Sequence, residues 1–310
     1  MEEVRGSSPL GPTSYYRRVM KKITKAIIPA AGFGTRFLPQ TKAMPKEMLP
    51  IIDKPIIQYV VEEAVSAGIT DIIIVTGMHK RSLEDHFDYN AELEDRLREN
   101  GKDEIAEQIH QIGDMANFIY VRQKGTYGNG TPILNSAHLI ADEPFLVLWA
   151  DDFVVGEVPR AKQLVEAYER LQKPVITLID VPKEDISKYG VVDVAEQIDS
   201  KTYKLKNIVE KPTAEEAPST FASVGGYILT PEILQNLASQ KPDASGEIYL
   251  SAALQDYMQS NDVYGLKIEG NWHDTGNKEK YLEAILDVAL SDPKLGLVIR
   301  DYVRNYVAKH

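Results

Sequence analysis

The sequence predicts an α/β protein built on a Rossmann-like, mixed but mostly parallel sheet with flanking helices. Three observations predict this fold. Short apolar runs that end at small or polar residues recur along the chain, which is typical of buried strands. Stretches with apolar residues at spacings of three and four, typical of helices, lie between these runs. The first elements follow in the order strand, loop, helix, strand, which favours parallel strands joined by crossover helices.

The first elements are defined by their apolar pattern and by proline and glycine. A strand is expected at residues 26–29, where the run Ala-Ile-Ile-Pro precedes a loop that contains two glycines. A helix begins at Pro55, which suits a first helical turn, and ends at Gly68. The apolar run at residues 71–76 is expected to form the second strand.

The rest of the chain continues the alternation of strands and helices. Further strands are expected at residues 118–121, 145–149, 175–179, 191–194, 205–209 and 224–229. Further helices are expected at residues 132–140, 160–172, 231–239, 247–259 and 277–290. No repeat, low-complexity segment or long linker divides this series, so a single domain is expected over residues 23–310, with a helical annex from about residue 277. Residues 1–22 are expected to be a disordered extension or a cloning remnant.

One segment differs in charge from the rest. Residues 82–114 contain eleven acidic and three basic side chains, so they carry most of the formal net charge of −11. Their apolar residues form only a narrow helical stripe. A solvated helical insertion is favoured over an acidic binding face, because charge runs usually mark a solvent-exposed surface.

Composition excludes several classes of function. The chain has no cysteine, which excludes a disulfide framework, a thiolate zinc site, an iron–sulfur cluster and a cysteine nucleophile. The acidic balance argues against a general nucleic-acid binder, which needs a basic face. No apolar run reaches the ~18 residues that a membrane-spanning helix needs, and the N-terminus does not read as a signal peptide. We therefore expect a cytoplasmic protein without nucleic-acid or membrane partners.

The loop after the first strand is the most informative stretch. Small residues let backbone N–H groups approach a ligand closely and form a cradle for an anion. Arg36 and Lys46 add charged donors for phosphate oxygens, and residues 36–54 carry a local net charge of +2. The small residues are Ala30, Ala31, Gly32 and Gly34. The glycines alone fit a tight turn equally well, but the two cations in the same loop favour phosphate binding.

Other nucleotide-binding and metal motifs are not met. A dinucleotide fingerprint requires a third glycine where this chain has Phe37. The chain also contains neither the P-loop pattern nor an H-E-x-x-H metal motif. The sequence therefore excludes a dinucleotide fingerprint, a P-loop and this metal motif.

Two stretches carry a family resemblance. The sequence PAAGFGTR at residues 29–36, followed by TKAMPKEMLP at residues 41–50, resembles the signature of bacterial UTP–glucose-1-phosphate uridylyltransferases. These are sugar nucleotidyltransferases, and the resemblance continues to about Leu290. It implies a nucleotide-diphospho-sugar transferase fold. It also implies an Mg²⁺-assisted reaction in which UTP and glucose 1-phosphate give UDP-glucose and pyrophosphate.

The resemblance also implies roles for individual residues. Arg36 and Lys46 are expected to be catalytic and to act on the nucleotide phosphates. Nucleotide binding falls to Ala30, Ala31, Gly32, Gly34, Gln123 and Gly128, and the Gln123 amide offers both a donor and an acceptor to a uracil edge. Sugar-phosphate binding falls to Gly190, Glu210 and Lys211, within the stretches YGVV and VEKP. Metal binding falls to Asp151 and Asp274. Asp152, one position on, is expected to have a structural or loop role.

The chain departs from the family pattern at a few positions. The stretch Gly128-Asn129-Gly130-Thr131-Pro132 stands where the family usually has G-L-G-H-A, which brings the choice between uridine and thymidine into question. Gly226 stands where arginine is common. Thymidylyl transfer or dual use of UTP and dTTP is therefore an alternative, and a non-catalytic nucleotide-sugar binding protein is an alternative of another class. The sequence leaves the hexose open and suggests a homo-dimer or homo-tetramer with contacts through residues 82–112 and 297–307.

Overall fold

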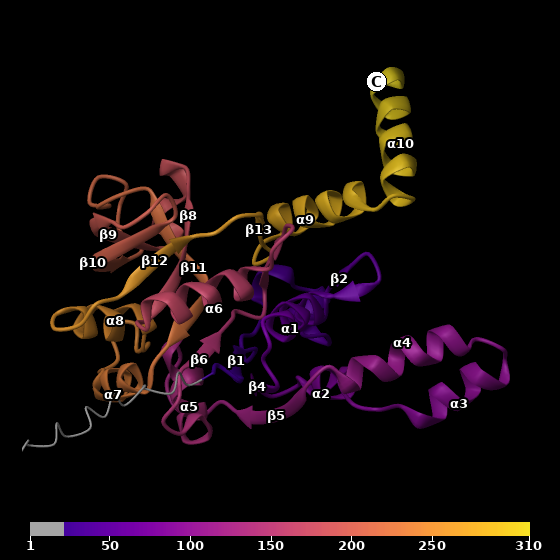
Figure 1. The fold of residues 1–310 in the computed structure, drawn as a ribbon. Helices are drawn as coiled ribbons and strands as arrows, with labels where there is room; N and C mark the ends of the chain where they lie inside the picture. Colours follow the sequence, from indigo (N-terminus) through magenta and orange to yellow (C-terminus); the bar gives the residue numbers. More distant parts are fainter. Residues whose placement is uncertain (1–21) are drawn as a thin grey trace, which may run out of the picture.

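A nine-stranded sheet forms the centre of the molecule (Figure 1). The computed structural model describes residues 22–310, so all but Lys22 of the expected extension lies outside the described residues. In spatial order the strands are β5 (Asn117–Arg122), β4 (Asp71–Thr76), β1 (Lys25–Pro29), β6 (Phe145–Val147), β11 (Phe221–Leu229), β8 (Val175–Asp180), β12 (Tyr264–Lys267), β10 (Thr202–Glu210) and β9 (Gly190–Gln197).

The sheet is mixed, as predicted. Strands β5, β4, β1 and β6 are parallel neighbours, and β12 is parallel to β8. Strand β11 runs antiparallel to β6 and β8, and β10 runs antiparallel to β12 and β9. Every strand of this sheet except β10 and β11 therefore points the same way. Strand β9 also pairs with the start of β11, so the pairings β11-β8-β12-β10-β9 close into a ring.

Helices cover both faces of the sheet. Helices α1 (Ile56–Ser66) and α6 (Arg160–Leu171) pack on one face, where Ile28, Ile72 and Leu146 are buried. Helices α5 (Gly130–Ile140), α7 (Pro231–Ser239) and α8 (Leu250–Met258) pack on the other, where Ile27, Ile73 and Val147 are buried. Neighbouring residues of one strand thus face opposite layers, as the pleat of a strand requires. The result is a three-layer α/β sandwich.

Two helical segments extend away from this body. Helices α2 (Arg81–His86), α3 (Ala91–Glu99) and α4 (Asp103–Asp114) occupy the acidic segment, and α3 and α4 lie side by side as a hairpin that reaches away from the sheet (Figure 1). Helices α9 (Lys278–Ser291) and α10 (Leu295–Lys309) follow the last strand, and α10 projects from the body at the C-terminus (Figure 1). Among the described residues, no helix is long and apolar enough to cross a membrane.

The structure contains short strands that the apolar pattern did not predict. Strand β7 (Asp152–Val155) pairs antiparallel with β13 (Asn271–Asp274), and β2 (Pro50–Ile51) pairs with β3 (Lys54–Pro55). Strand β12 was also not expected. The strand predicted at 145–149 ends at Val147, and the helix predicted at 247–259 begins at Leu250. The β7–β13 pair matters most, because it places Asp274 opposite Asp152, next to Asp151.

Candidate active site

A cavity of about 540 Å³ gathers seven of the predicted site residues. Its walls come from the loop after β1, the segment between β6 and β7, the start of β9, the end of β10 and the end of β13. The seven residues are Arg36, Lys46, Asp151, Gly190, Glu210, Lys211 and Asp274. Ligands of open α/β sheets commonly bind beyond the carboxyl ends of strands. The loop after β1 and Asp151 occupy such positions, since they follow β1 and β6. Asp274 ends β13, which pairs with β7 outside this sheet.

A second cavity, of about 500 Å³, is also lined by residues of the loop after β1. It contains three more predicted residues, Ala31, Gly32 and Gln123. Phe33, Met44, Met78 and Tyr127 contribute large apolar side chains to its wall, and the Phe33 and Tyr127 rings lie 5.9 Å apart. An apolar slot with a single amide suits a flat heterocycle that needs both stacking and hydrogen bonds.

Glycines of the β1 loop let the chain pass close to Lys46. Gly34 has a φ of +64°, and a Cβ built there would lie 3.1 Å from the Lys46 Cβ. A Cβ at Gly32 would lie 3.8 Å from the Lys46 Cε. Ala30 is buried and its N–H donates to the carbonyl of Val75, which extends the parallel pairing of β1. Ala30 and Gly34 therefore shape the loop, and neither lines these two cavities.

Gly128 lies at a close contact between two backbone segments. It has a φ of +106°, and a Cβ there would lie 2.2 Å from the Ile248 carbonyl oxygen. The glycine is needed because two backbone segments meet here: the Ile248 N–H donates to the Tyr127 carbonyl at 2.9 Å. Gly128 lines neither cavity. It can affect the site only by setting the positions of its neighbours, since Tyr127 lines the second cavity and Asn129 the first.

Lys46 and Asp151 form an ion pair in the wall of the first cavity. Burial lowers the pKa of Lys46, but the attraction of Asp151 and its hydrogen bond outweigh burial, so the net pKa is raised. Burial likewise raises the pKa of Asp151, but the charge and hydrogen bond of Lys46 bring it below its usual value. Both groups are therefore charged at neutral pH. Arg36 lies beside them and donates to the Gly276 carbonyl at 3.3 Å.

Asp274 converges on Asp151 although the two are far apart in sequence. A Cβ built on Gly276 would lie 2.8 Å from Asp274 Oδ1 and 3.8 Å from Asp151 Oδ2. Thr275 fixes this approach, because its N–H and its hydroxyl both donate to the Asp151 carbonyl, at 3.0 and 2.6 Å. Burial raises the pKa of Asp274. Its oxygens accept from the Gly276 N–H at 2.8 Å and the Tyr189 hydroxyl at 3.1 Å.

This pair of carboxylates fits a magnesium ion. Among residues 22–310, no group of three or more His, Asp or Glu side chains is arranged to enclose a metal. Mg²⁺ does not need such a cage, because it is usually held by one or two carboxylates together with phosphate oxygens and water. Asp151 and Asp274 supply two. His273 is buried beside the Phe153 ring, 5.2 Å between centroids, and does not line the cavity.

Gly190, Glu210 and Lys211 lie together at the far end of the first cavity. A Cβ at Gly190 would lie 3.3 Å from Glu210 Oε2, so a larger residue here would press on the carboxylate. Lys211 has a φ of +45° and its N–H donates to the Tyr189 carbonyl at 3.0 Å. Its ammonium lies 3.9 Å from Glu210 Oε1 and 5.3 Å from the Tyr249 ring centre.

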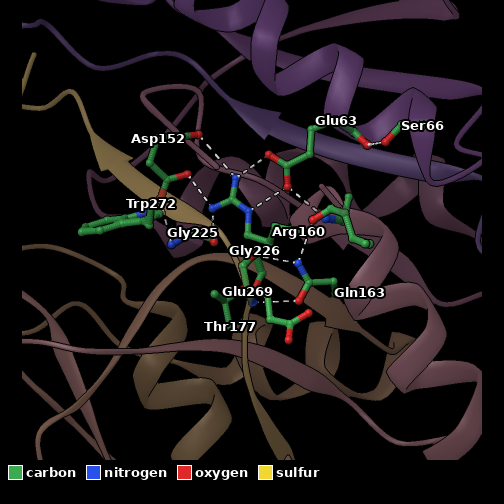
Figure 2. A network of polar contacts seen from close by, with 12 residues as sticks. Glu63, Ser66, Asp152, Arg160, Gln163, Thr177, Gly225, Gly226, Glu269 and Trp272 are labelled. Carbon is green, nitrogen blue, oxygen red and sulfur yellow. Dashed lines mark hydrogen bonds and ion pairs between the residues drawn. The ribbon is translucent and has the colours of Figure 1, made fainter. Parts of the chain in front are cut away.

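Asp152 has the structural role expected for it. It is buried, and its carboxylate accepts from Arg160 NH1 at 2.9 Å, from the Gly225 N–H at 2.9 Å and from the Trp272 indole at 3.1 Å (Figure 2). Burial raises the pKa of Asp152 to about 6, against the opposing effect of Arg160. Arg160 and its partner Glu63 were not predicted from the sequence.

A second buried ion pair was also not predicted. Lys80 donates to Glu47 at 2.6 Å, and both side chains are almost fully buried. Burial lowers the pKa of Lys80 and raises that of Glu47. Glu47 directly follows Lys46, which lines the first cavity, and Lys80 lines the second. The Lys80–Glu47 ion pair therefore connects the walls of the two cavities. Lys80 follows β4 in a polar loop, and no local signal singles it out.

Asn129, Thr131 and Gly226, which differ from the family pattern, each make contacts that explain their presence. The Asn129 side chain accepts from the Leu250 N–H at 2.8 Å and so satisfies the start of α8. Thr131 is buried and bonds within its own turn, to the Tyr127 carbonyl at 3.3 Å. Neither lines the apolar cavity that contains Gln123. At Gly226, φ is +117° and a Cβ would lie 2.8 Å from the Arg160 Cδ, so Arg160 fills the space beside this glycine.

Comparison with known proteins gives a consistent set of relatives. The model of the nucleotidyl transferase family matches residues 25–291. A UTP–glucose-1-phosphate uridylyltransferase of Staphylococcus haemolyticus is 50% identical over 276 residues, which are 89% of this chain and 96% of that protein. The protein of the same name from Bacillus subtilis is 48% identical over 276 residues, 89% of this chain and 94% of its own.

Solved structures show the same likeness. A UDP-glucose pyrophosphorylase complexed with UDP-glucose is 41% identical with a TM-score of 0.79, and the match covers 87% of this chain and 100% of that one. A UTP-bound UGPase from Acinetobacter baumannii is 36% identical with a TM-score of 0.84, covering 91% and 98%. A putative glucose-1-phosphate thymidylyltransferase from Bacillus anthracis is 23% identical with a TM-score of 0.66, covering 84% and 94%, and shares the fold.

Proposed function

The chain belongs to the nucleotidyl transferase family, and we propose that it makes UDP-glucose and pyrophosphate from UTP and glucose 1-phosphate. The observation that carries this function is the convergence of Arg36, Lys46, Asp151 and Asp274 on one cavity beside an apolar cavity with Gln123. The cations suit a triphosphate, the carboxylates suit a divalent ion, and the apolar cavity suits a base. The relatives that share about half of their residues with this chain have uridylyltransferase names.

The reaction is an in-line displacement at the α-phosphorus of UTP. A phosphate oxygen of glucose 1-phosphate forms the new P–O bond, the bond to the β-phosphate breaks, and its electron pair leaves with pyrophosphate. Because the attacking oxygen is already an anion, no general base is required. Catalysis then consists of positioning two anions and neutralising their charge.

The proposed roles of the chain's own residues follow from where they lie. Arg36 and Lys46 bind the nucleotide phosphates and stabilise the leaving group, since both line the cavity beside the β1 loop. Lys211 holds the sugar phosphate, while Glu210 and the Gly190 backbone bind sugar hydroxyls. Asp151 and Asp274 would hold Mg²⁺, which neutralises phosphate charge when bound. The Asp151–Lys46 ion pair keeps a carboxylate and a cation charged and oriented before substrate arrives.

The assignment of Asp274 provides the decisive test. In Asp274→Asn we expect Mg²⁺-dependent pyrophosphate release to fall by about a hundredfold or more, because a charged ligand is lost. Asp287→Asn is the matched control, since Asp287 is half exposed and lies outside the cavity. Near-normal UDP-glucose synthesis by Asp274→Asn would contradict the site.

Substrate choice is tested with a matrix of nucleotides and sugar phosphates. We expect the highest kcat/KM with UTP and glucose 1-phosphate. Equal values for UTP and dTTP would favour the dual-use alternative. Tight binding of UDP-glucose without pyrophosphate release from any pair would favour a non-catalytic binding protein.

We also propose a cytoplasmic homo-oligomer, a dimer or tetramer, made of one domain over residues 23–310. Helix α10 supports self-association, because it has 15 residues and, of these, only Gly296 is buried. A lone helix of that length is marginally stable in water. Its large exposed apolar residues are Leu295, Leu297, Val298, Tyr302, Val303, Tyr306 and Val307. Light scattering should show a smaller particle when the chain ends before Leu295, and an unchanged stoichiometry would contradict this contact.

A further inference from the structure

Arg160 is a fully buried arginine whose five N–H donors all have partners (Figure 2). It is the first residue of α6. Its Nε and NH2 groups donate to the two oxygens of Glu63 at 2.9 and 3.1 Å. Its NH1 group donates to Asp152 Oδ1 at 2.9 Å and to the Gly225 carbonyl, and NH2 also reaches the Asp152 carbonyl at 3.4 Å. One guanidinium thus joins α1, α6, β7 and β11.

Stability alone does not account for this network. It places one cation between two carboxylates in the core, and both Glu63 and Asp152 are buried. Removing charged groups from water is costly, and well-packed apolar side chains of similar volume often give equal or greater stability. A planar guanidinium, however, fixes the direction of each partner, which an apolar side chain does not. The arrangement is therefore suited to setting positions.

The positions that it sets belong to the wall of the active-site cavity. Asp152 turns its second oxygen to the Gly225 N–H and the Trp272 indole, and both of these residues line the cavity. In the β7–β13 pair Asp152 lies opposite Asp274, and Asp151 directly precedes it. Trp272 in turn packs edge-on against Tyr189, with ring centres 5.7 Å apart.

Strand β11 is bent where it meets Arg160. Its pairing with β8 shifts register between Ser223 and Tyr227. At Gly226, a Cβ would lie 2.5 Å from the Thr177 hydroxyl and 2.8 Å from the Arg160 Cδ. The Thr177 hydroxyl donates to the Gly226 carbonyl at 2.8 Å, which holds the bend (Figure 2). The bend makes room for Arg160 and directs the Gly225 backbone toward Asp152 and Arg160.

We propose that Arg160 is a positioning residue of the active site: through Asp152 it fixes β7, the Gly225 bend and Trp272, and so sets the separation of Asp151 and Asp274. Arg160 does not line the cavity itself. This inference rests on the proposed function for its kinetic consequence, but the geometry of the network can be measured without any substrate.

Arg160→Lys is the informative variant, because it keeps the charge and loses the planar fork. We expect kcat to fall by about tenfold or more and the Mg²⁺ concentration for half-maximal activity to rise by a similar factor, as for other residues that orient metal ligands. KM for UTP should change by less than about twofold, because the apolar cavity with Gln123 is built from other elements.

Two further variants separate positioning from folding. Glu63→Gln alters the other partner of Arg160, which contacts nothing in the cavity, so it should lower Tm with little change in kcat. Arg170→Lys is the matched control on the same helix, since Arg170 is half exposed and pairs with Asp199. An Arg160→Lys enzyme that loses only Tm, with wild-type kcat and Mg²⁺ dependence, would overturn the proposal.

A spectroscopic measurement tests the network independently of catalysis. The chain has two tryptophans, so in a Trp149→Phe background Trp272 is the only one. Arg160→Lys should shift the Trp272 emission maximum, because the indole donates to the carboxylate that Arg160 holds. Arg170→Lys should not. An unchanged emission would count against the inference, whereas failure of the wild type to release pyrophosphate would count against the proposed function alone.

Discussion

The hydroxyl of Tyr189 donates a hydrogen bond to Asp274 Oδ2 across 3.1 Å, which connects the start of β9 to the end of β13. Tyr189 directly precedes the glycine at which the sugar is expected to bind, and Asp274 is the candidate metal ligand. Burial raises the pKa of Asp274, whereas the hydrogen bonds from Gly276 and Tyr189 act in the opposite direction. The tyrosine therefore helps to keep the carboxylate ionised.

Replacing Tyr189 by phenylalanine should weaken the enzyme and change its pH profile. One hydrogen bond to a charged group contributes about 1.5 kcal/mol, so activity should fall by roughly tenfold. Without this donor the pKa of Asp274 rises further, so the acid limb of kcat/KM should move to higher pH. Tyr203→Phe is the control, because Tyr203 packs on Phe221 away from the cavity. An unchanged pH profile would show that Tyr189 does not act on Asp274.

Lys46 is expected to be the most sensitive cation. In Lys46→Met the nucleotide phosphates lose a charged partner in a partly buried site, so kcat should fall by about a hundred- to a thousandfold. The pKa of Asp151 should rise, since Lys46 is what holds it down against burial. Single-turnover pyrophosphate release measures the first effect. Lys25→Met is the control, because the Lys25–Glu143 ion pair is about as exposed as the Lys46–Asp151 pair but lies at the opposite end of β1. Its activity should stay within about twofold of wild type. Comparable losses in the two variants would argue against a specific role for Lys46.

Two glycines allow backbone strain to be separated from steric overlap. Gly125 and Gly128 have φ values of +93° and +106°, but a Cβ at Gly125 meets nothing within 4 Å, whereas one at Gly128 would lie 2.2 Å from the Ile248 carbonyl oxygen. Alanine at Gly125 should cost about 1 kcal/mol from strain alone. Alanine at Gly128 should cost more than twice as much, because two backbone segments must separate. Urea midpoints compare the two, and equal losses would refute the account of Gly128.

Most parallel strands could be predicted from sequence, but β12 and the short antiparallel pairs β2–β3 and β7–β13 could not. Strands such as β4 are buried on both faces, so they appear as an uninterrupted apolar run. Strand β13 consists of Asn-Trp-His-Asp and has no apolar pattern. It forms because β7 supplies hydrogen-bond partners more than a hundred residues earlier in the chain. The pattern of apolar residues within a segment does not show which distant segment it pairs with.

The same distinction applies to the site. The β1 loop concentrates small residues and cations in one short stretch, and seven predicted residues do line a single cavity. The contacts that orient them join distant positions: Arg160 and Glu63 are 97 residues apart, and Tyr189 and Asp274 are 85 apart. In sequence, Arg160 is an ordinary charged residue at a helix start. Only the packed fold reveals that it is buried.

One surface carboxylate should make stability depend on pH in a predictable direction. Asp199 accepts from Arg170 at 2.6 Å and from the N–H groups of Lys201 and Thr202 at 2.9 and 2.8 Å. The hydrogen bond from Arg170 is the largest cause that holds the pKa of Asp199 well below its usual value. A depressed folded-state pKa contributes stability above the unfolded pKa of about 3.9, and that contribution is lost as pH falls toward the folded value.

Asp199→Asn should therefore destabilise the protein near neutral pH and have a smaller effect in acid. Because the Asp199 and Arg170 side chains are 36% and 52% exposed, solvent screening limits the difference near neutral pH to about 1 kcal/mol or less. Urea unfolding of both proteins between pH 7 and about pH 3 should show the two midpoints drawing closer below about pH 4, because Asp199 is protonated first in the unfolded state. Asp95→Asn, at a more exposed carboxylate whose ion pair with Arg98 spans 3.7 Å, is the control and should show no such convergence. A gap between wild type and Asp199→Asn that stays constant across this range would mean that the charge of Asp199, as distinct from its hydrogen bonds to Lys201 and Thr202, adds nothing to stability.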